Sequence, residues 1–416
     1  MELLTNPFVT LGATMRDDRR RIMGLAEEMS LISDEVAVRD AAAVLTNPRR
    51  RLEAEIGWLP GLGPKQIVEV ISILEREPAR IRNLGKLPSL ARANLLADGL
   101  IRLIDQLAEL DVARWIVDLA VADEDIDAEQ TVTSLNEERL VAGFPTVQDL
   151  QSVETELQGR RQYYTQAIKR ALDQLPFPSR VEVVTVAVDE ATDNGDSHAP
   201  VLIDDLADSF EVEAQRLLEE GQRNIEVLVQ RARRAASRDG SHEEVGRHVS
   251  QLTEAVRNWD RLAQPIQLSA RSRGTSHGPS HEIAGEIRSL AVDLFNQHGL
   301  LNISRRLTRL QQEVFAEVDR VVEQSEEDVA ALDEIAVRRE QLLADMKTRA
   351  EARKRGRFLR LAVGFGVLIL IWWAIVDQED VPEGSSVPVY GDTIMSLRET
   401  QFPRTAPLWI CRHHNM

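Results

Sequence analysis

Apolar residues recur every three or four positions along most of the chain before residue 358, which is the spacing of one face of an α-helix. In the first such segment, Thr14 followed by Asp17 resembles a capping box and predicts where the helix begins. Its apolar face consists of Ile22, Leu25, Ala26, Met29 and Ile32. The pattern therefore predicts an all-α protein.

The next segment, Asp34 to Leu45, places Val38, Ala41, Ala42 and Leu45 on one helix face. It ends before "TNPRRRLEAEI", where Thr46 or Asn47 can cap a new helix. Pro48 suits the first helical position, where its missing N–H costs nothing. Arg49, Arg50 and Arg51 are then expected as exposed side chains in the first turn, where cations are slightly unfavourable.

Helical spacing continues from residue 61 to 190 and from 205 to 347, with "TDNGDSHAP" in a predicted linker at 191–204. The segment "RVEVVTVAVDEA" alternates like a strand at Val184, Val186 and Val188, but no partner strand follows, so a helix is expected. Two further helices are predicted at about Ile283–His298 and Ile303–Lys347. The apolar stripe of the second fits either an intramolecular core or a coiled-coil seam between two copies.

One segment predicts a membrane anchor. From Phe358 to Val376 the only charged residue is Arg360. Nineteen helical residues span roughly 28 Å, close to the ~30 Å hydrocarbon core of a bilayer. The flank at 348–357 is basic, and the flank after Asp377 is acidic, which predicts a cytoplasmic N-terminal part and an extracytoplasmic tail at 377–416. The residues expected to meet anionic lipid headgroups are Arg353, Lys354, Arg355 and Arg357.

Composition and charge narrow the function. The 416 residues carry a formal net charge of −18, which disfavours nucleic acid as a partner. Cys411 is the single cysteine, so neither an internal disulfide nor a multi-thiolate metal site is expected. The N-terminus "MELLTNPFVTLG" lacks the features of a cleaved signal peptide.

Candidate catalytic and metal motifs are incomplete. In "HEEVGRH" the two histidines are six positions apart, which turns them away from each other on a helix. His277 and His281 are expected in a solvated loop because Gly278 and Pro279 lie between them. The acids of "DEDIDAEQ" lack the glycine and the glutamate that a calcium loop requires. No cofactor, metal or catalytic residue is predicted.

The stretch "NWDRLAQPIQLSARSRG" is the most distinctive polar segment. Trp259, Arg271 and Arg273 are residue types that are enriched at binding hot spots, so a protein-recognition surface is one interpretation. The other is a buried tryptophan at a helix junction, with the two arginines solvated or paired.

The first sixty residues resemble a J-domain, the helical module of DnaJ-type co-chaperones. The similar features are "NPFVTLG", a basic second helix with Arg19, Arg20 and Arg21, and "AAAVLTNPRRRLEAEI". Other stretches, among them "LARANLLADGL" and "NWDRLAQPIQLSARSRG", resemble a family of bacterial membrane-anchored J-domain-like proteins. A J-domain that stimulates a DnaK-type ATPase carries His-Pro-Asp between its second and third helices. Here that place reads "EEMSLISDEVAV", and His198 is the first histidine of the chain.

The resemblance implies a J-domain-like unit at 1–60, a helical domain at 61–190 and a helical or coiled-coil domain at 205–347. The resemblance supplies architecture rather than a reaction. With the predicted membrane anchor and the missing His-Pro-Asp, we interpret the chain as a non-enzymatic protein-binding or assembly factor of the bacterial inner membrane that has lost ATPase stimulation. Arg19–Arg21 and Arg49–Arg51 are the expected partner contacts. One alternative is a co-chaperone that recruits a DnaK-type chaperone by non-standard contacts, and another is a hydrolase with an unrecognised site. A homo-oligomer is compatible with each of these.

Overall fold

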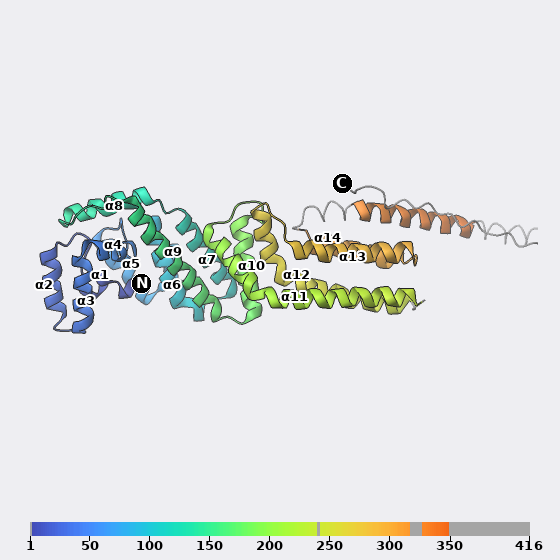
Figure 1. Cartoon of the computed structure of the whole chain (residues 1–416), viewed down its shortest axis with the longest axis horizontal. Helices are drawn as coiled ribbons and strands as arrows, with labels where there is room; N and C mark the ends of the chain where they lie inside the picture. Colours follow the sequence, from blue (N-terminus) through green and yellow to red (C-terminus); the bar gives the residue numbers. More distant parts are fainter. Residues whose placement is uncertain (1, 239–241, 317–326, 349–416) are drawn as a thin grey trace, which may run out of the picture. The chain divides into compact units, whose positions relative to one another are not determined.

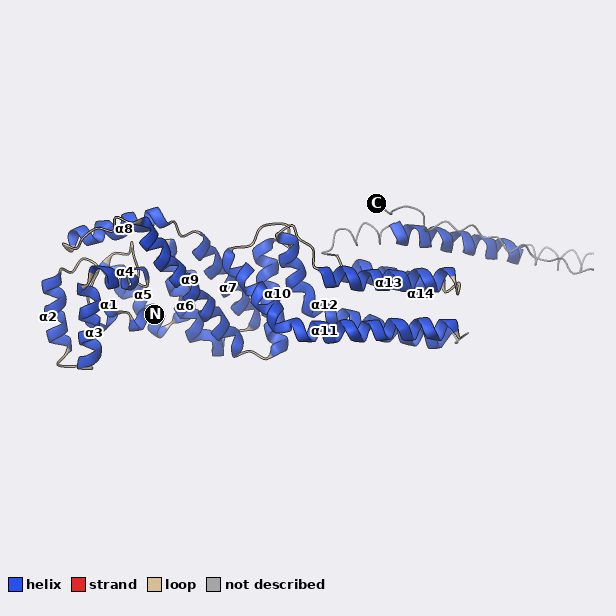
Figure 2. Ribbon diagram, in the orientation of Figure 1, coloured by secondary structure: helices blue, strands red, loops and turns tan. Residues whose placement is uncertain are grey.

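The computed structural model describes residues 2–238, 242–316 and 327–348, and the described part is all-helical, without a strand. The chain divides into two compact units, Met1–Glu340 and Gln341–Met416, and the fold below is that of the first. The helices, shown in Figure 2, are α1 Pro7–Leu11, α2 Arg19–Met29, α3 Glu35–Thr46, α4 Pro48–Ile56, α5 Pro64–Arg76, α6 Ser89–Leu103, α7 Glu109–Glu124, α8 Ala128–Val141, α9 Leu150–Asp173, α10 Phe177–Thr192, α11 Val201–Ser237, α12 His242–Ser272, α13 Gly278–Asn296 and α14 Leu301–Val314. Short 3₁₀ helices occupy Leu3–Thr5, Pro78–Asn83 and Ile104–Gln106, and residues 327–348 are also helical.

The helices α2 and α3 form a pair at the N-terminal end, with α1 packed against α3 (Figure 1). The expected apolar face is buried at Ile22, Leu25 and Ala26, but Ile32 is 79% exposed because α2 ends at Met29. The predicted cap at Thr14 is also wrong. Asp18 caps α2, with its side chain accepting a hydrogen bond from the Arg21 N–H.

Most of α6 is buried, and it packs against α7 and α9. The segment that alternates like a strand is helix α10, as predicted. Its buried residues include Val181, Val184 and Val188, which follow helical spacing and pack among neighbouring helices. α10 contacts α7, which precedes the predicted linker in sequence, and α12, which follows it. The domain boundaries themselves stay a prediction.

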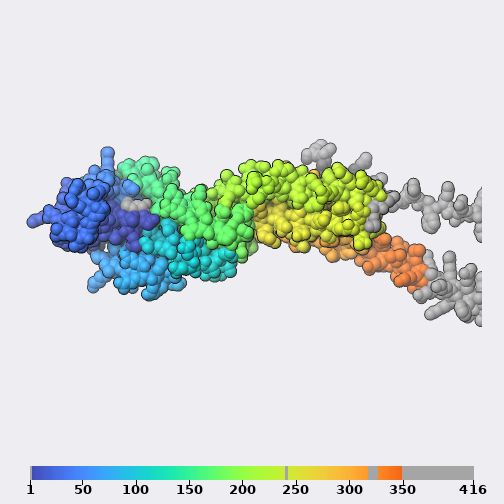
Figure 3. All heavy atoms as spheres, turned by 90° about the horizontal axis from the view of Figure 1, so that it is seen from below, coloured from blue at the N-terminus to red at the C-terminus, as the bar shows by residue number. Residues whose placement is uncertain are grey.

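The longest helices, α11 and α12, form an extended pair (Figure 1). Figure 3 shows their side chains, in yellow-green and yellow, packed together on the face that it presents. The single helix expected at Ile303–Lys347 is wrong, because α14 ends at Val314 and Phe315 leaves helical geometry to become fully buried. Leu307, Leu310 and Val314 are buried in the first unit, which makes this part of the stripe intramolecular core.

The loop expected around His277 and His281 is much shorter than predicted. α12 continues to Ser272, and α13 begins at Gly278 with Pro279 in its first turn. A proline is tolerated there because the first-turn N–H groups have no intrahelical partner. His281 therefore lies on a helix.

The predicted anchor at 358–376, its basic flank with Arg353, Lys354, Arg355 and Arg357, and the tail at 377–416 lie outside the described residues. Among the described residues, no helix has the length and apolar character required to span a membrane.

Candidate protein-binding surface at the start of α4

The junction between α3 and α4 is built as the sequence predicts. The side-chain Oδ1 of Asn47 accepts hydrogen bonds from the backbone N–H groups of Arg49, at 3.0 Å, and Arg50, at 3.3 Å. Pro48 occupies the first turn, where it needs no hydrogen-bond donor. The three arginines thus lie in the first turn of α4, but their side chains have different environments.

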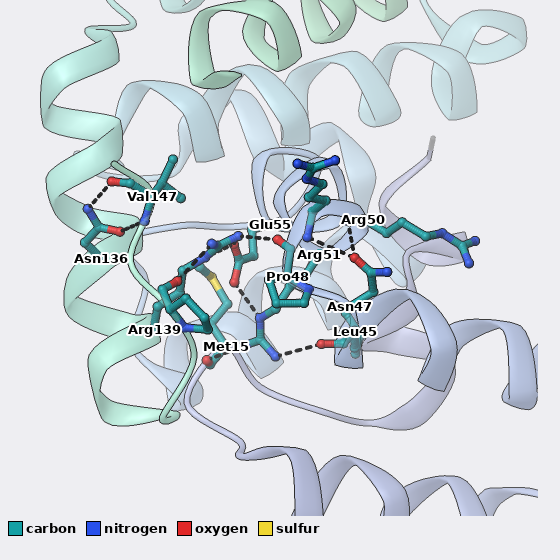
Figure 4. Close-up of polar contacts among 12 residues, drawn as sticks. Met15, Leu45, Asn47, Pro48, Arg50, Arg51, Glu55, Asn136, Arg139 and Val147 are labelled. Carbon is teal, nitrogen blue, oxygen red and sulfur yellow. Dashed lines mark hydrogen bonds and ion pairs between the residues drawn. The ribbon is translucent and has the colours of Figure 1, made fainter. Parts of the chain in front are cut away.

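Arg51 is not a partner contact, because its side chain is fully buried. Its guanidinium donates to Glu55 at 2.6 Å, to the Met15 carbonyl at 2.7 Å and to the Leu45 carbonyl at 3.3 Å (Figure 4). It also lies 4.0 Å from the ring centroid of Phe144, in a cation–π contact. The expectation that Arg51 is exposed is wrong, since helix spacing turns it into the core while its two neighbours point outward.

Glu55 joins Arg51 to a second buried arginine, Arg139 of α8. The Arg139 Nε donates to Glu55 at 2.8 Å, and its other nitrogens donate to the carbonyls of Pro48 and Pro145. Burial lowers the pKa of Arg51, and the adjacent Glu55 opposes that shift. The Arg51–Glu55–Arg139 triad thus fixes the start of α4 to α8 and to the loop before α2, with both buried guanidinium groups sharing the Glu55 carboxylate.

Four of the exposed arginines lie at the starts of α2 and α4, and we call Arg19, Arg20, Arg49 and Arg50 the basic face. Arg19 donates to the Thr46 carbonyl at 2.9 Å, which brings the start of α2 beside the start of α4. Figure 4 shows the side chain of Arg50 directed away from the triad.

The side chains of Arg20, Arg49 and Arg50 make no hydrogen bond or ion pair with the described residues. Arg21, the remaining predicted contact, is exposed and lies 3.4 Å from Glu28. The basic face therefore presents three guanidinium groups that are available to a partner.

The opposite end of the α2–α3 pair is apolar. Leu31 is 85% exposed, Ile32 is 79% exposed and Val36 is 63% exposed. These residues belong to the stretch "EEMSLISDEVAV", which the predicted J-domain resemblance places between its second and third helices. The rim around them is acidic at Glu27 and Asp34. A solvent-exposed apolar group of this kind is typical of an interaction site.

Trp259 is not part of an exposed recognition surface, because it is 3% exposed. Its indole N–H donates to the Leu218 carbonyl at 3.1 Å, across the α11–α12 contact. A Cβ atom at Gly221 would lie 2.8 Å from the Trp259 ring, so the glycine permits the close approach of the two helices. The buried alternative is confirmed for this residue.

Arg271 and Arg273 are paired within the chain. Arg271 lies 2.8 Å from Asp196, and Arg273 lies 2.9 Å from Asp204 and 2.8 Å from Asp208. They join the end of α12 to the start of α11 and the loop that precedes it. A recognition surface built on Trp259, Arg271 and Arg273 is therefore wrong, because the three residues hold the two helices together.

A buried polar cluster between α6 and α9 was not anticipated from the sequence. Asn94 donates to the carbonyls of Ile56 and Trp58, and its own oxygen accepts from Arg160 at 2.5 Å and Tyr164 at 2.6 Å. The available signal was "ARANLLADGL", in which Asn94 and Asp98 lie four positions apart, and so on one helix face, within a largely apolar stretch.

Asp98, one turn after Asn94, is the second member of this cluster. Its carboxylate accepts from the Leu3 N–H at 2.6 Å and from the Tyr163 hydroxyl at 2.5 Å. Burial raises the pKa of Asp98, and burial together with the neighbouring carboxylate raises the pKa of Tyr163. Asp98 is 2% exposed, so this carboxylate anchors the N-terminal segment to α6 and α9.

The burial of His277 predicts a loss of stability in acid. His277 is 9% exposed, its ring stacks on Trp259, and burial lowers the His277 pKa to about 4. An unfolded histidine titrates near 6.5, so between about pH 6.5 and 4 the unfolded chain takes up a proton that the folded chain does not. Acidification across that window is therefore expected to cost up to about 3 kcal/mol of unfolding free energy.

The measurement compares wild type with His277→Gln by denaturant unfolding at pH 7 and at pH 4.5. The variant is expected to lose less stability than wild type on acidification. His242→Gln, at an exposed histidine, serves as the control. Equal acid sensitivity of wild type and His277→Gln would contradict the prediction.

A scan against protein-family models, a search of curated proteins and a search of solved structures found no match to this chain. The resemblance to J-domains is therefore a prediction, carried by the residues quoted for it.

Proposed function

We propose that this protein is a non-enzymatic binding factor that captures an acidic protein partner on its basic face. The observation that carries the proposal is the exposure of Arg20, Arg49 and Arg50 without a side-chain partner among the described residues. Arg49 and Arg50 lie in the first turn of α4, where the helix dipole slightly disfavours cations. An acidic surface that docks there would offset this cost.

Rigidity of the junction supports the same proposal. The buried triad and the Asn47 cap hold the backbone from which the arginines project. A preorganised charged surface loses less conformational freedom on binding than a mobile one. Although the chain as a whole is acidic, the basic face is a local patch of positive charge. It attracts an acidic partner, which favours rapid and oriented association.

The biological setting is part of the proposal. We infer a bacterial inner-membrane protein that is anchored through residues 358–376, with the basic face on the cytoplasmic side and its juxtamembrane arginines at lipid headgroups. The J-domain-like order of the first sixty residues makes a divergent co-chaperone the closest functional class. The absence of His-Pro-Asp argues against stimulation of a DnaK-type ATPase.

The test is photo-crosslinking in intact membranes, with a photoreactive amino acid at Ala43, an exposed position on α3. Reversing three charges, Arg20→Glu, Arg49→Glu and Arg50→Glu, is expected to lower the yield of partner crosslinks about tenfold, equivalent to about 1.4 kcal/mol. Arg76→Glu, Arg102→Glu and Arg114→Glu change the net charge equally at exposed arginines elsewhere and are expected to leave the yield unchanged.

Equal loss in both triple variants would show that only net charge matters and would reject the basic face. The identity of the crosslinked protein separates the alternatives. A DnaK-type chaperone whose crosslink disappears on addition of ATP would favour active chaperone recruitment. Any other acidic protein, insensitive to ATP, would favour the binding or assembly factor.

A further inference from the structure

A second basic site lies far along the chain from the basic face, in a cavity of about 320 Å³ between α12 and α14. Its charged lining consists of Arg257, Arg305, Arg306, Arg309 and Glu313. The volume is at the small end of the ~300–1,000 Å³ range of ligand pockets. Leu310 is the one large apolar side chain in the lining, so the cavity is suited to a polar ligand rather than to an apolar one.

Two of the four arginines are partly neutralised. Arg257 forms a double hydrogen bond with Glu313, at 3.0 and 2.8 Å. Arg305 lies 2.5 Å from Asp333, but its Nε is buried and has no hydrogen-bond partner among the described residues. That N–H leaves an unsatisfied donor next to the cavity, which a bound anion would satisfy.

The other two arginines have no paired counter-charge in the described part of the chain. Arg306 and Arg309 are exposed, and neither forms an ion pair or a side-chain hydrogen bond with the described residues. Among the described residues, two acids therefore pair with two of the four guanidinium groups, and the other two positive charges have no paired acid there, in a chain of net charge −18. Mutual repulsion disfavours such a cluster unless an anion occupies it.

We propose that this cavity, the arginine groove, binds a phosphate or diphosphate group. Arg305 and Arg309 are four positions apart on α14 and so share a helix face, with Arg306 beside them. The planar fork of a guanidinium donates two parallel hydrogen bonds to a phosphate, and several such forks match its tetrahedral oxygens. Thr253 and Asn302 add polar groups to the lining.

A phosphate group of this kind comes either from a soluble phosphorylated compound or from a phospholipid headgroup. The experiment distinguishes these sources by calorimetry on the full-length chain in a neutral detergent, titrated separately with pyrophosphate and with dihexanoyl phosphatidic acid. Binding of pyrophosphate alone identifies a soluble ligand, and binding of phosphatidic acid alone identifies a headgroup. Either result supports the arginine groove, provided that the binding depends on its arginines.

That dependence is tested with Arg306→Gln combined with Arg309→Gln, which is expected to weaken binding at least about tenfold. The control, Arg231→Gln with Arg234→Gln, removes the same charge from exposed positions on α11 and is expected to leave binding within about twofold. All four side chains are exposed, so the fold is expected to persist, and circular dichroism checks it.

Three results would overturn the proposal. The first is no binding of either phosphate compound by the wild-type chain at millimolar concentration. The second is an equal loss of binding in the two double variants, which would indicate attraction to net charge alone. The third is tighter binding of succinate than of pyrophosphate, which would identify a carboxylate site of the kind an acidic peptide fills. None of these results depends on the basic face around α4.

Discussion

Replacing Glu55 with glutamine is expected to lower the unfolding free energy by about 3–5 kcal/mol, because it leaves two buried arginines without their shared counter-charge. Both oxygens of Glu55 accept hydrogen bonds, one from Arg51 and the other from Arg139. A glutamine amide supplies one acceptor at most and no negative charge. The measurement is denaturant unfolding, together with hydrogen exchange of the amides of α4 and α8.

The matched control is Glu53→Gln, on the exposed side of the same helix, which is expected to change stability by less than about 0.5 kcal/mol. If Glu55→Gln also remained within that range, the triad would contribute little to the fold. The triad also donates hydrogen bonds to backbone carbonyls. A triple apolar variant, with Arg51→Met, Glu55→Leu and Arg139→Met, tests the contribution of these bonds to stability. Apolar replacement of a buried ion triad is often neutral, but here it also removes donors from four backbone carbonyls, so stability is not expected to recover. These carbonyls belong to Met15, Leu45, Pro48 and Pro145.

Asn94→Leu is expected to destabilise the first unit by about 3–5 kcal/mol, although the two side chains are close in size. Asn94 is fully buried, and its amide satisfies two backbone carbonyls while its oxygen accepts from Arg160 and Tyr164. A leucine leaves all four groups buried without this partner. Each unsatisfied group costs about 1–3 kcal/mol, with part of that cost relieved by local rearrangement.

The control for Asn94→Leu is Asn224→Leu, an exposed position within α11. It makes the same chemical change at the surface and is expected to shift stability by less than about 0.5 kcal/mol. Thermal unfolding of the two variants beside wild type is the measurement. Similar midpoints for Asn94→Leu and wild type would show that water or rearranged side chains replace the amide.

The two buried clusters explain how the basic face is held. The triad fixes α4 from one side, and Asn94 fixes the backbone immediately after α4 by its bonds to Ile56 and Trp58. Destabilising either cluster is therefore expected to weaken partner binding indirectly. Charge reversal at Arg49 and Arg50 acts on binding alone, since those side chains are exposed. A comparison of stability with crosslinking yield separates the two effects.

The sequence by itself determined that the protein is all-helical and where several of its helices begin, because the signals for these features come from residues close together in the sequence. Asn47 caps a helix through donors two and three positions away, and Pro48 follows from the same local rule. The valines of α10 occupy helical spacing whatever packs against them. The end of α14 at Val314 was missed, since Phe315 turns into a core that is assembled from other helices.

Only the tertiary structure decided which polar residues face solvent. Arg49, Arg50 and Arg51 are identical in chemistry and adjacent in sequence, yet Arg51 alone is fully buried. Its environment depends on Glu55 and on Arg139, which lies 84 positions beyond Glu55. The same is true of Arg273, paired with Asp204 across 69 positions. The local spacing of apolar residues carries no information about such distant partners. Because burying an unpaired charge is costly, an arginine is buried in the core only where the fold supplies those partners, and otherwise it stays at the surface.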